Sequence, residues 1–135
     1  MTTNATTPPM LDSQLLTAFV ETFAGYGNLD APYWYVGMEE GGDSTSFERR
    51  VSVWRDRGSS IIEDLREYHV AIKLEDLFVS SARLQSTWKQ LIRITLRAEG
   101  LPCSVDAIRE YQARQLGRRD GGTALLELYP LPART

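Results

Sequence analysis

A chain of 135 residues and 15.2 kDa has the size of one domain, and folding at that size buries roughly two-thirds of the surface of the unfolded chain. Hydrophobic residues make up 42% and charged residues 24% of the chain, which excludes a disordered or fibrous protein. The net charge of −3 argues against an overall field that attracts nucleic acid, and it leaves local basic patches open.

The sequence has no sign of a membrane segment or of a signal peptide. Its apolar runs are shorter than the roughly 18 residues of a membrane span, so we expect a cytoplasmic protein with no membrane partner. The single cysteine, Cys103, has no neighbouring histidine or second cysteine, which favours a structural thiol. For the function that we favour at the end of this section, we expect neither a metal nor a cofactor.

The first third of the chain predicts a tail, a helix and a strand. Residues 1–10 have no apolar periodicity and are expected to form a flexible tail before a single α/β domain over 11–135. Apolar side chains at three- and four-residue spacing predict a helix over 12–24, which the glycines of 25–28 end. The aromatic and β-branched run over 33–38 predicts a strand. Because this run is apolar on both faces, we expect a central parallel strand with helices above and below it.

Four further helices are predicted from the same spacing and from the capping residues and glycines around them. They cover 44–57, 60–73, 83–99 and 104–117. A second strand follows from Thr123 to Tyr129, and Pro130 and Pro132 are expected to end it. The order of elements predicts an α/β fold with a parallel sheet and crossover helices.

Two strands are too few for a stable parallel sheet. Either further strands lie within the segments predicted to be helical, or residues 11–135 are the N-terminal part of a larger domain. The sequence leaves both alternatives open.

Basic residues cluster on one of the predicted helices. Lys89, Arg93 and Arg97 recur every four residues and would line one helix face. A solvated surface and a surface that follows a phosphate backbone both fit this pattern. The one histidine, His69, lies within an apolar helical stripe and is predicted to be structural.

The most unusual segment comes at the end of the first predicted strand, where glycines surround acidic residues. It consists of Gly37, Met38, Glu39, Glu40, Gly41 and Gly42, followed by Asp43. In open parallel sheets, ligands bind outside the carboxyl ends of the strands. Glycines allow the backbone to approach a ligand, and carboxylates bind hard cations, position water or stabilise a positively charged transition state. This segment is therefore the candidate functional site.

The strand followed by Gly37 to Gly41, the helices after it and the second strand leading into Leu128 to Pro132 resemble the uracil-DNA glycosylase superfamily. In that superfamily the first strand ends in a glycine loop. The second or third position of the loop carries an acid or amide that assists hydrolysis of the bond between base and sugar. The third position here is Glu39 and the second is Met38. The resemblance implies a three-layer α/β/α fold, DNA as the partner, and hydrolysis of that bond.

The resemblance also implies a role for each residue of the site. Glu39 would orient the attacking water or stabilise the oxocarbenium-like sugar. The residues expected to bind the flipped base are Gly37, Met38, Glu40, Gly41, Gly42, Tyr35, Glu127 and Tyr129. Tyr35 or Tyr129 would stack on the base, and Glu127 stands roughly where the superfamily often has an asparagine that reads it. This chain has Glu40 in place of the loop proline of the superfamily and has no counterpart of its late histidine-containing loop, so retention of the activity stays open.

Two other functions fit the same segments. An unpaired edge at Leu125 to Tyr129 would make the chain an interaction module that pairs with a second copy or with another protein. Alternatively, Glu39, Glu40 and Asp43 would form a divalent-metal site for hydrolysis of phosphate esters.

Overall fold

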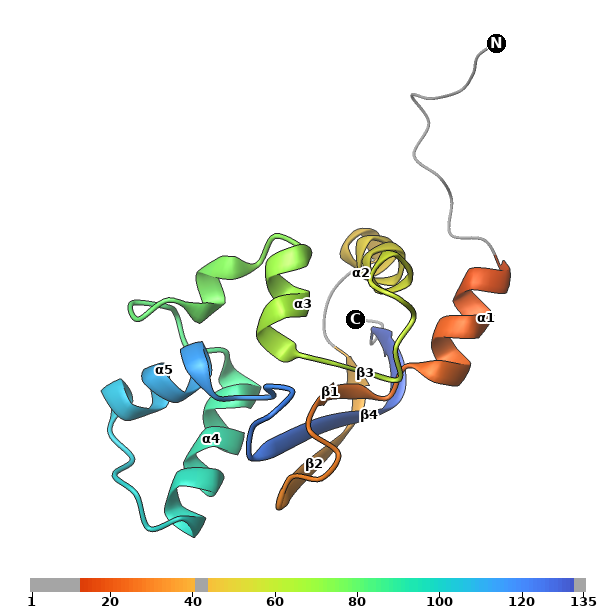
Figure 1. The fold of residues 1–135 in the computed structure, drawn as a ribbon. Helices are drawn as coiled ribbons and strands as arrows, with labels where there is room; N and C mark the ends of the chain where they lie inside the picture. Colours follow the sequence, from red (N-terminus) through yellow and green to blue (C-terminus); the bar gives the residue numbers. More distant parts are fainter. Residues whose placement is uncertain (1–12, 41–43, 133–135) are drawn as a thin grey trace.

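A computed structural model describes residues 13–40 and 44–132 of the chain. These residues form a four-stranded sheet and helices that pack against it (Figure 1). The strands are β1 (Gly25–Gly27), β2 (Tyr33–Glu40), β3 (Ile62–Glu63) and β4 (Thr123–Pro132). The helices are α1 (Ser13–Thr22), α2 (Ser44–Asp56), α3 (Leu65–Ala71), the 3-10 helix η1 (Glu75–Phe78), α4 (Ser86–Ala98) and α5 (Val105–Arg114). The α/β class predicted from the sequence is confirmed.

The sheet is mixed and mostly parallel, with the strand order β2-β4-β1-β3. β2 runs parallel to β4, and β1 runs parallel to β3, while β1 and β4 are antiparallel. β1 lies in the segment predicted to end the first helix, and β3 lies within the predicted helix over 60–73. β3 therefore agrees with the first of the two alternatives left open, a strand within a segment predicted to be helical, while β1 lies in a predicted turn.

The predicted helix over 60–73 is wrong at its start. β3 comes first and pairs with β1. Asp64 then takes an extended backbone conformation, and its side chain accepts a hydrogen bond from the backbone N–H of Glu67 at 3.0 Å. Such an N-cap residue is not helical itself, so α3 begins only at Leu65. The other four predicted helices agree with α1, α2, α4 and α5 to within three residues at each end.

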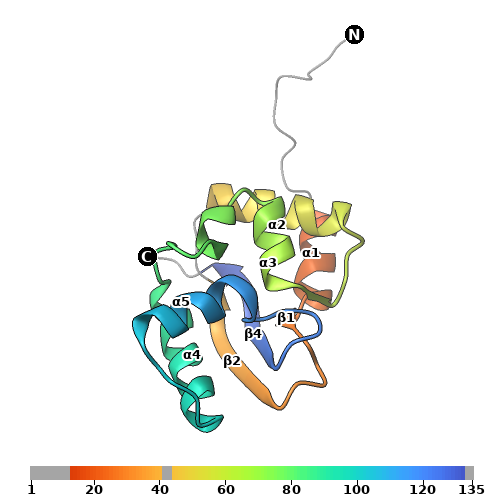
Figure 2. The same ribbon diagram turned by 60° about the vertical axis from the view of Figure 1, so that its left-hand side comes forward.

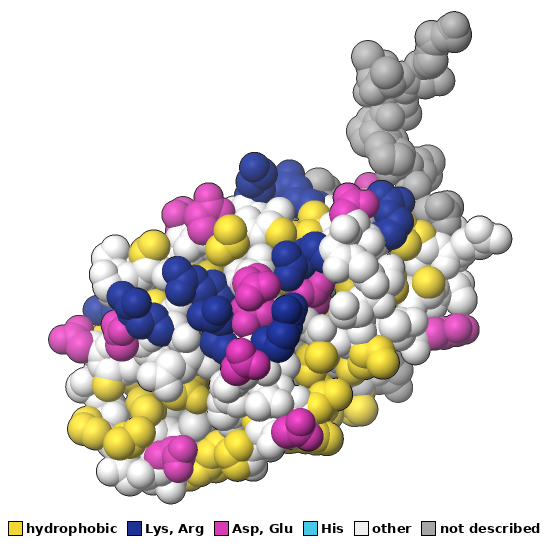
Figure 3. All heavy atoms as spheres, in the orientation of Figure 1, with side chains coloured by type: hydrophobic (Ala, Val, Ile, Leu, Met, Phe, Trp, Pro, Cys, Tyr) yellow, Lys and Arg dark blue, Asp and Glu magenta, His cyan; other side chains and the backbone are white. Residues whose placement is uncertain are grey.

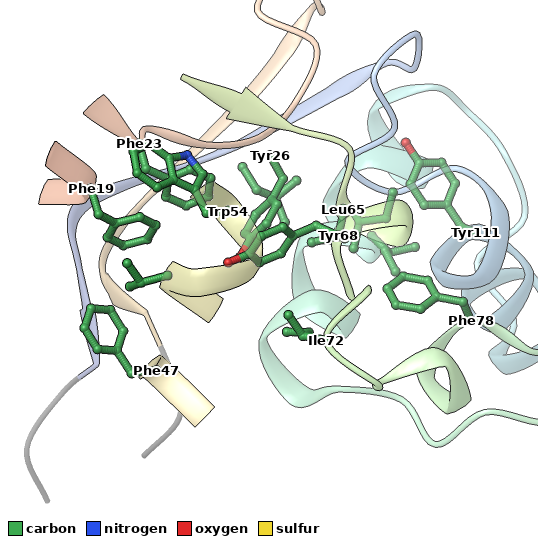
Figure 4. Close-up of a cluster of buried hydrophobic side chains, with 14 of the residues drawn as sticks. Phe19, Phe23, Tyr26, Phe47, Trp54, Leu65, Tyr68, Ile72, Phe78 and Tyr111 are labelled. Carbon is green, nitrogen blue, oxygen red and sulfur yellow. The ribbon is translucent and has the colours of Figure 1, made fainter. Parts of the chain in front are cut away.

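One face of the sheet packs against the helices and carries an aromatic core (Figure 4). Tyr26 of β1 projects into it, with ring centroids 5.4 Å from Phe23 and 5.7 Å from Tyr68. Phe19 of α1 lies edge-on to Trp54 of α2 at 5.1 Å. Figures 1 and 2 show α2, α3, α4 and α5 gathered around this side of the sheet. Ring pairs of this kind each add about 1 kcal/mol beyond the burial of their area, so the core holds the helices firmly against the strands.

The opposite face of the sheet is open along β2. This strand lies at the edge of the sheet, and its Trp34 and Val36 side chains are 53% and 59% exposed. The prediction of a central strand covered on both faces is therefore wrong, because the apolar run over 33–38 is buried on one face only. Residues 13–40 and 44–132 form two layers, and a second helical layer is not found among them.

β4 lies inside the sheet, between β2 and β1. Its Leu125 and Leu126 are paired on both sides, so the predicted unpaired edge at Leu125 to Tyr129 is wrong over this part. β4 also continues through Pro130 to Pro132, beyond its predicted end. β1 stops opposite Leu126, so beyond that point β2 is the one described strand beside β4. Proline lacks a backbone N–H, and it is tolerated where one side of a strand has no partner that needs this N–H.

His69 lies in the core and is 4% exposed. Its Nδ1–H donates to the backbone carbonyl of Leu65 at 2.7 Å, and its ring packs 5.3 Å from that of Tyr26 and 5.4 Å from that of Trp88. Burial lowers the pKa of His69 to about 4, so the ring is neutral at pH 7. The structure agrees with the structural role predicted for this histidine.

Candidate functional site

The parallel pairing of β2 with β4 places the two predicted site segments side by side (Figure 1). The paired residues are Tyr35 with Leu125, Gly37 with Glu127, and Glu39 with Tyr129. The carboxyl ends of both strands therefore lie side by side at the same end of the sheet, as the sequence predicted. In parallel sheets, loops converge and ligands bind beyond the carboxyl ends of the strands.

The predicted glycine loop is in large part a strand. Gly37, Met38, Glu39 and Glu40 all belong to β2, and the pairing with β4 shifts register between Glu39 and Glu40, where Glu40 comes opposite Pro132. Gly41 and Gly42, like Asp43 of the predicted metal site, lie outside the described residues. A register irregularity at a strand end re-aims the chain, and such features are frequent next to active sites.

Gly37 and Glu127 fit each other closely. A Cβ atom built on Gly37 would lie 3.0 Å from Oε2 of Glu127. The carboxylate of Glu127 therefore extends over the Cα of Gly37, into space that any other residue at position 37 would fill. Gly37 and Glu127 pair with each other across β2 and β4. Leu125 precedes Glu127 by two residues, and Tyr35 precedes Gly37 by two, so all four residues belong to the same face of the sheet. The Glu127 carboxylate therefore lies on this face, beside the predicted site.

Tyr35 points to the helices. Its hydroxyl lies 2.5 Å from Oγ1 of Thr95 on α4, and the Thr95 hydroxyl donates to the backbone carbonyl of Leu91 at 2.9 Å. Because the hydrogen of Thr95 is used in that bond, Tyr35 is the donor between the two hydroxyls. Tyr35 is thus held against α4.

A group of ionised side chains around two buried carboxylates, which we call the acid–arginine corner, was not predicted from the sequence. It consists of Glu63 and Asp64 with Arg57, Arg118 and Arg119. Arg57 binds Glu63 through two nitrogens, the closer at 2.9 Å, and Arg118 binds Asp64 at 2.9 Å. The corner therefore joins the end of α2, the start of α3 and the segment before β4.

Hydrogen bonds control the ionisation of Asp64 in this corner. Burial alone would raise its pKa, but hydrogen bonds from the backbone N–H groups of Glu67 and Arg119 and from the Arg118 side chain outweigh burial and lower the pKa. The ion pair with Glu63 raises the pKa of Arg57. Asp64 and Glu67 form the D-x-x-E pattern of a capping box, which was the one local signal for this cluster.

The acid–arginine corner borders a shallow pocket of about 380 Å³ before β4. The pocket includes Gly121 and Gly122, so it lies at the amino ends of β2 and β4, away from the candidate site. Acidic and basic side chains alternate on the surface shown in Figure 3. Because the charges of the corner are paired with one another, we interpret it as a structural element and not as a second site.

In comparisons with family models, with curated proteins and with solved structures, no match to this chain was found. Among the side chains that the structure describes, three or more potential metal ligands do not come together, and the side chains of Glu39, Glu40 and Asp43 are not among those described. The helices of residues 13–40 and 44–132 include none of the length and apolar character that crossing a membrane requires.

Proposed function

We propose that this chain is a uracil-DNA glycosylase-like domain that hydrolyses the bond between a base and deoxyribose in DNA. The observation that carries the proposal is the register of β2 and β4, which sets Gly37 opposite Glu127 and Glu39 opposite Tyr129. This register supports the proposal because it sets the backbone positions of the proposed acid, Glu39, and of proposed base-binding residues next to one another at the carboxyl ends of the two strands. The proposal includes the three-layer architecture of the superfamily, whereas the described residues form one mixed sheet with helices on one face.

In the proposed reaction, water attacks the sugar carbon that carries the base. The bond from that carbon to the base nitrogen breaks, and its electron pair leaves with the base. The carboxylate of Glu39 accepts a proton from the attacking water, and its negative charge stabilises the oxocarbenium-like sugar in the transition state. A carboxylate suits both tasks at neutral pH.

Base recognition in this proposal depends on Glu127. An ionised carboxylate accepts hydrogen bonds and donates none. We therefore expect the site to prefer a base whose exposed edge carries N–H groups over one that requires an amide donor. The absence of a side chain at Gly37 lets the Glu127 carboxylate reach across to β2.

Replacing Glu39 by glutamine is expected to lower the rate of base release about 100-fold, because an amide neither takes the proton from water nor carries the negative charge. The measurement is the release of free base from single-stranded oligonucleotides containing uracil, with parallel series containing other bases. Glu48→Gln is the matched control, since Glu48 is an exposed glutamate of α2 with no ion pair to a described residue. Its rate should equal that of the unaltered protein.

Two outcomes contradict the proposal. The first is an absence of base release by the unaltered protein from every oligonucleotide of the series, with the chain expressed as its full reading frame. The second is a Glu39→Gln variant that retains the full rate, because catalysis would then come from another group.

We propose a protein-interaction module as the second candidate function, now using the edge of β2 instead of the last strand. β2 has no charged residue from Tyr33 to Met38, and Trp34 and Val36 beside this edge are more than half exposed. Edge strands usually carry charges that prevent pairing with other chains. Two β2 strands paired about a two-fold axis would join two sheets in a homodimer.

For this dimer, light scattering at rising protein concentration is expected to show a change from monomer to dimer. Val36→Lys should keep the chain monomeric, because it places two like charges near the axis. Val79→Lys is the control, since Val79 is exposed and follows η1, outside the sheet. A monomer at every concentration would exclude this candidate.

A further inference from the structure

α4 is the most strongly basic helix of the described chain. Its thirteen residues include Lys89, Arg93 and Arg97 and contain no aspartate or glutamate. Four residues advance an α-helix by about 6 Å, so the three side chains follow one another at that interval along one side. Ile92, Thr95 and Leu96 take the buried side of the helix. We call the three cations the α4 basic stripe.

The α4 basic stripe makes no ion pair with any side chain that the structure describes. Glu99, the first acid after the helix, accepts a hydrogen bond from Tyr33 on the side of β2. The neighbouring helix α5 differs, because Asp106 pairs with Arg109 at 3.9 Å and Glu110 pairs with Arg114 at 2.5 Å. The positive charge of α5 is thus neutralised along the helix, whereas that of α4 is available to a partner.

Two contacts fix the direction of α4 against β2. Tyr33 donates to Glu99 at 3.2 Å, and Tyr35 contacts Thr95 two residues further along the strand. α4 therefore runs in the opposite direction to β2, and the start of α4 lies toward the carboxyl end of β2. The stripe runs alongside β2, as Figure 2 shows for the helix, and Lys89 is at the end directed toward the candidate site.

We propose that the α4 basic stripe binds the phosphate backbone of a nucleic acid strand. Evenly spaced cations without acidic neighbours complement a linear polyanion, and such contacts add affinity without selecting a sequence. The choice of nucleic acid as the polyanion rests on the proposed function, in which a DNA strand has to be held while its base enters the site. The stripe adds to that function a surface on a different element from the reacting groups.

The test is the salt dependence of binding to a fluorescent single-stranded oligonucleotide of ordinary bases, measured by anisotropy. Removing two phosphate contacts with the double variant Arg93→Gln and Arg97→Gln should reduce the slope of log K against log salt by about 1.4, since each contact contributes about 0.7 for a single strand. The matched control is Arg55→Gln with Arg114→Gln, because these arginines are ion-paired helix residues and their loss changes the net charge equally. The control should retain the slope of the unaltered protein.

Equal slopes for the two double variants would overturn the inference, as would no binding by the unaltered protein at low salt. Preferential binding to vesicles of anionic lipid, with the oligonucleotide ignored, would also overturn it and assign the stripe to a membrane surface. The oligonucleotide contains no base to be excised. A failure of the glycosylase proposal therefore appears in the base-release assay and leaves this measurement unaffected.

Discussion

Replacing Gly27 by alanine is expected to destabilise the protein by about 4 kcal/mol. Gly27 has a φ of +109°, which residues with a side chain rarely adopt. A Cβ atom there would lie 2.3 Å from the backbone oxygen of Thr123 and 2.9 Å from the Cα of Ala124. Both atoms belong to the backbone of β4, so the clash is relieved only by breaking the pairing of β1 with β4.

Gly58 provides the control for this substitution, because its φ is +110° and no atom lies within 4 Å of the position of its Cβ. Gly58→Ala therefore reports the strain of the backbone conformation alone, about 1 to 2 kcal/mol. The difference between the two variants isolates the clash with β4. Urea unfolding followed by the fluorescence of the buried Trp54 measures both, and equal losses would show that the close approach of β1 and β4 does not matter for stability.

The close approach of β1 also bears on the candidate site. β4 is held on one side by β1 and on the other by β2, and its position along β2 decides which residues face each other at the carboxyl ends. A shift of one residue would turn Glu127 to the other face of the sheet. The pairing of Gly37 with Glu127 thus depends on glycines some distance away from the site.

The elements with strong local patterns were predictable from the sequence. Apolar spacing predicted α1, α2, α4 and α5, and the runs over 33–38 and 123–129 predicted β2 and β4. β1 and β3 are three and two residues long, which is too short for any local pattern. They form because of their partners in the sheet: β1 pairs with β4 and with β3. The sequence predicted that Gly25 and Gly27 end a helix. Both have positive φ, a conformation that glycine adopts at helix ends and also where two strands approach closely, so the sequence alone does not distinguish these roles.

The position of β2 in the sheet was not predictable from its composition. An apolar run on both faces normally indicates a central strand, yet Trp34 and Val36 are exposed. The meeting of the two strand ends was predictable, because strands joined through helices pair in parallel and direct their carboxyl ends to one edge. The fit of Glu127 over Gly37 depends on the exact register, which neither segment encodes alone.

The acid–arginine corner was missed for a related reason. Its residues come from positions 57 to 119 and meet only after α2, α3 and β4 have packed. Arg118 and Arg119 lie next to each other in the sequence, which gives no local sign that Glu63 and Asp64 are their partners. In the structure Arg118 binds the buried carboxylate of Asp64 and Arg119 that of Glu63, while the two arginine side chains stay 32% and 55% exposed.

Replacing Asp64 by asparagine is expected to destabilise the protein by about 3 kcal/mol at pH 7. The Asp64 side chain is 2% exposed, and its Oδ2 accepts from Nε of Arg118 and from the backbone N–H of Arg119, each at 2.9 Å. Oδ1 accepts the capping hydrogen bond from Glu67. An amide group in place of either oxygen would point N–H groups at N–H groups and leave the partly exposed Arg118 guanidinium without its charged partner.

The same substitution predicts how stability depends on pH. The pKa of Asp64 is lower in the folded chain than in the unfolded chain, so its contribution is complete above about pH 4 and is lost as the pH falls through the folded value. The difference in unfolding free energy between the unaltered protein and Asp64→Asn should therefore be constant near neutrality and shrink in acid. Asp56→Asn is the control, because Asp56 pairs with Arg55 on the surface and its loss should change stability by less than about 1 kcal/mol at any pH. A difference for Asp64→Asn that persists unchanged at pH 2 would assign the loss to packing and not to the charge.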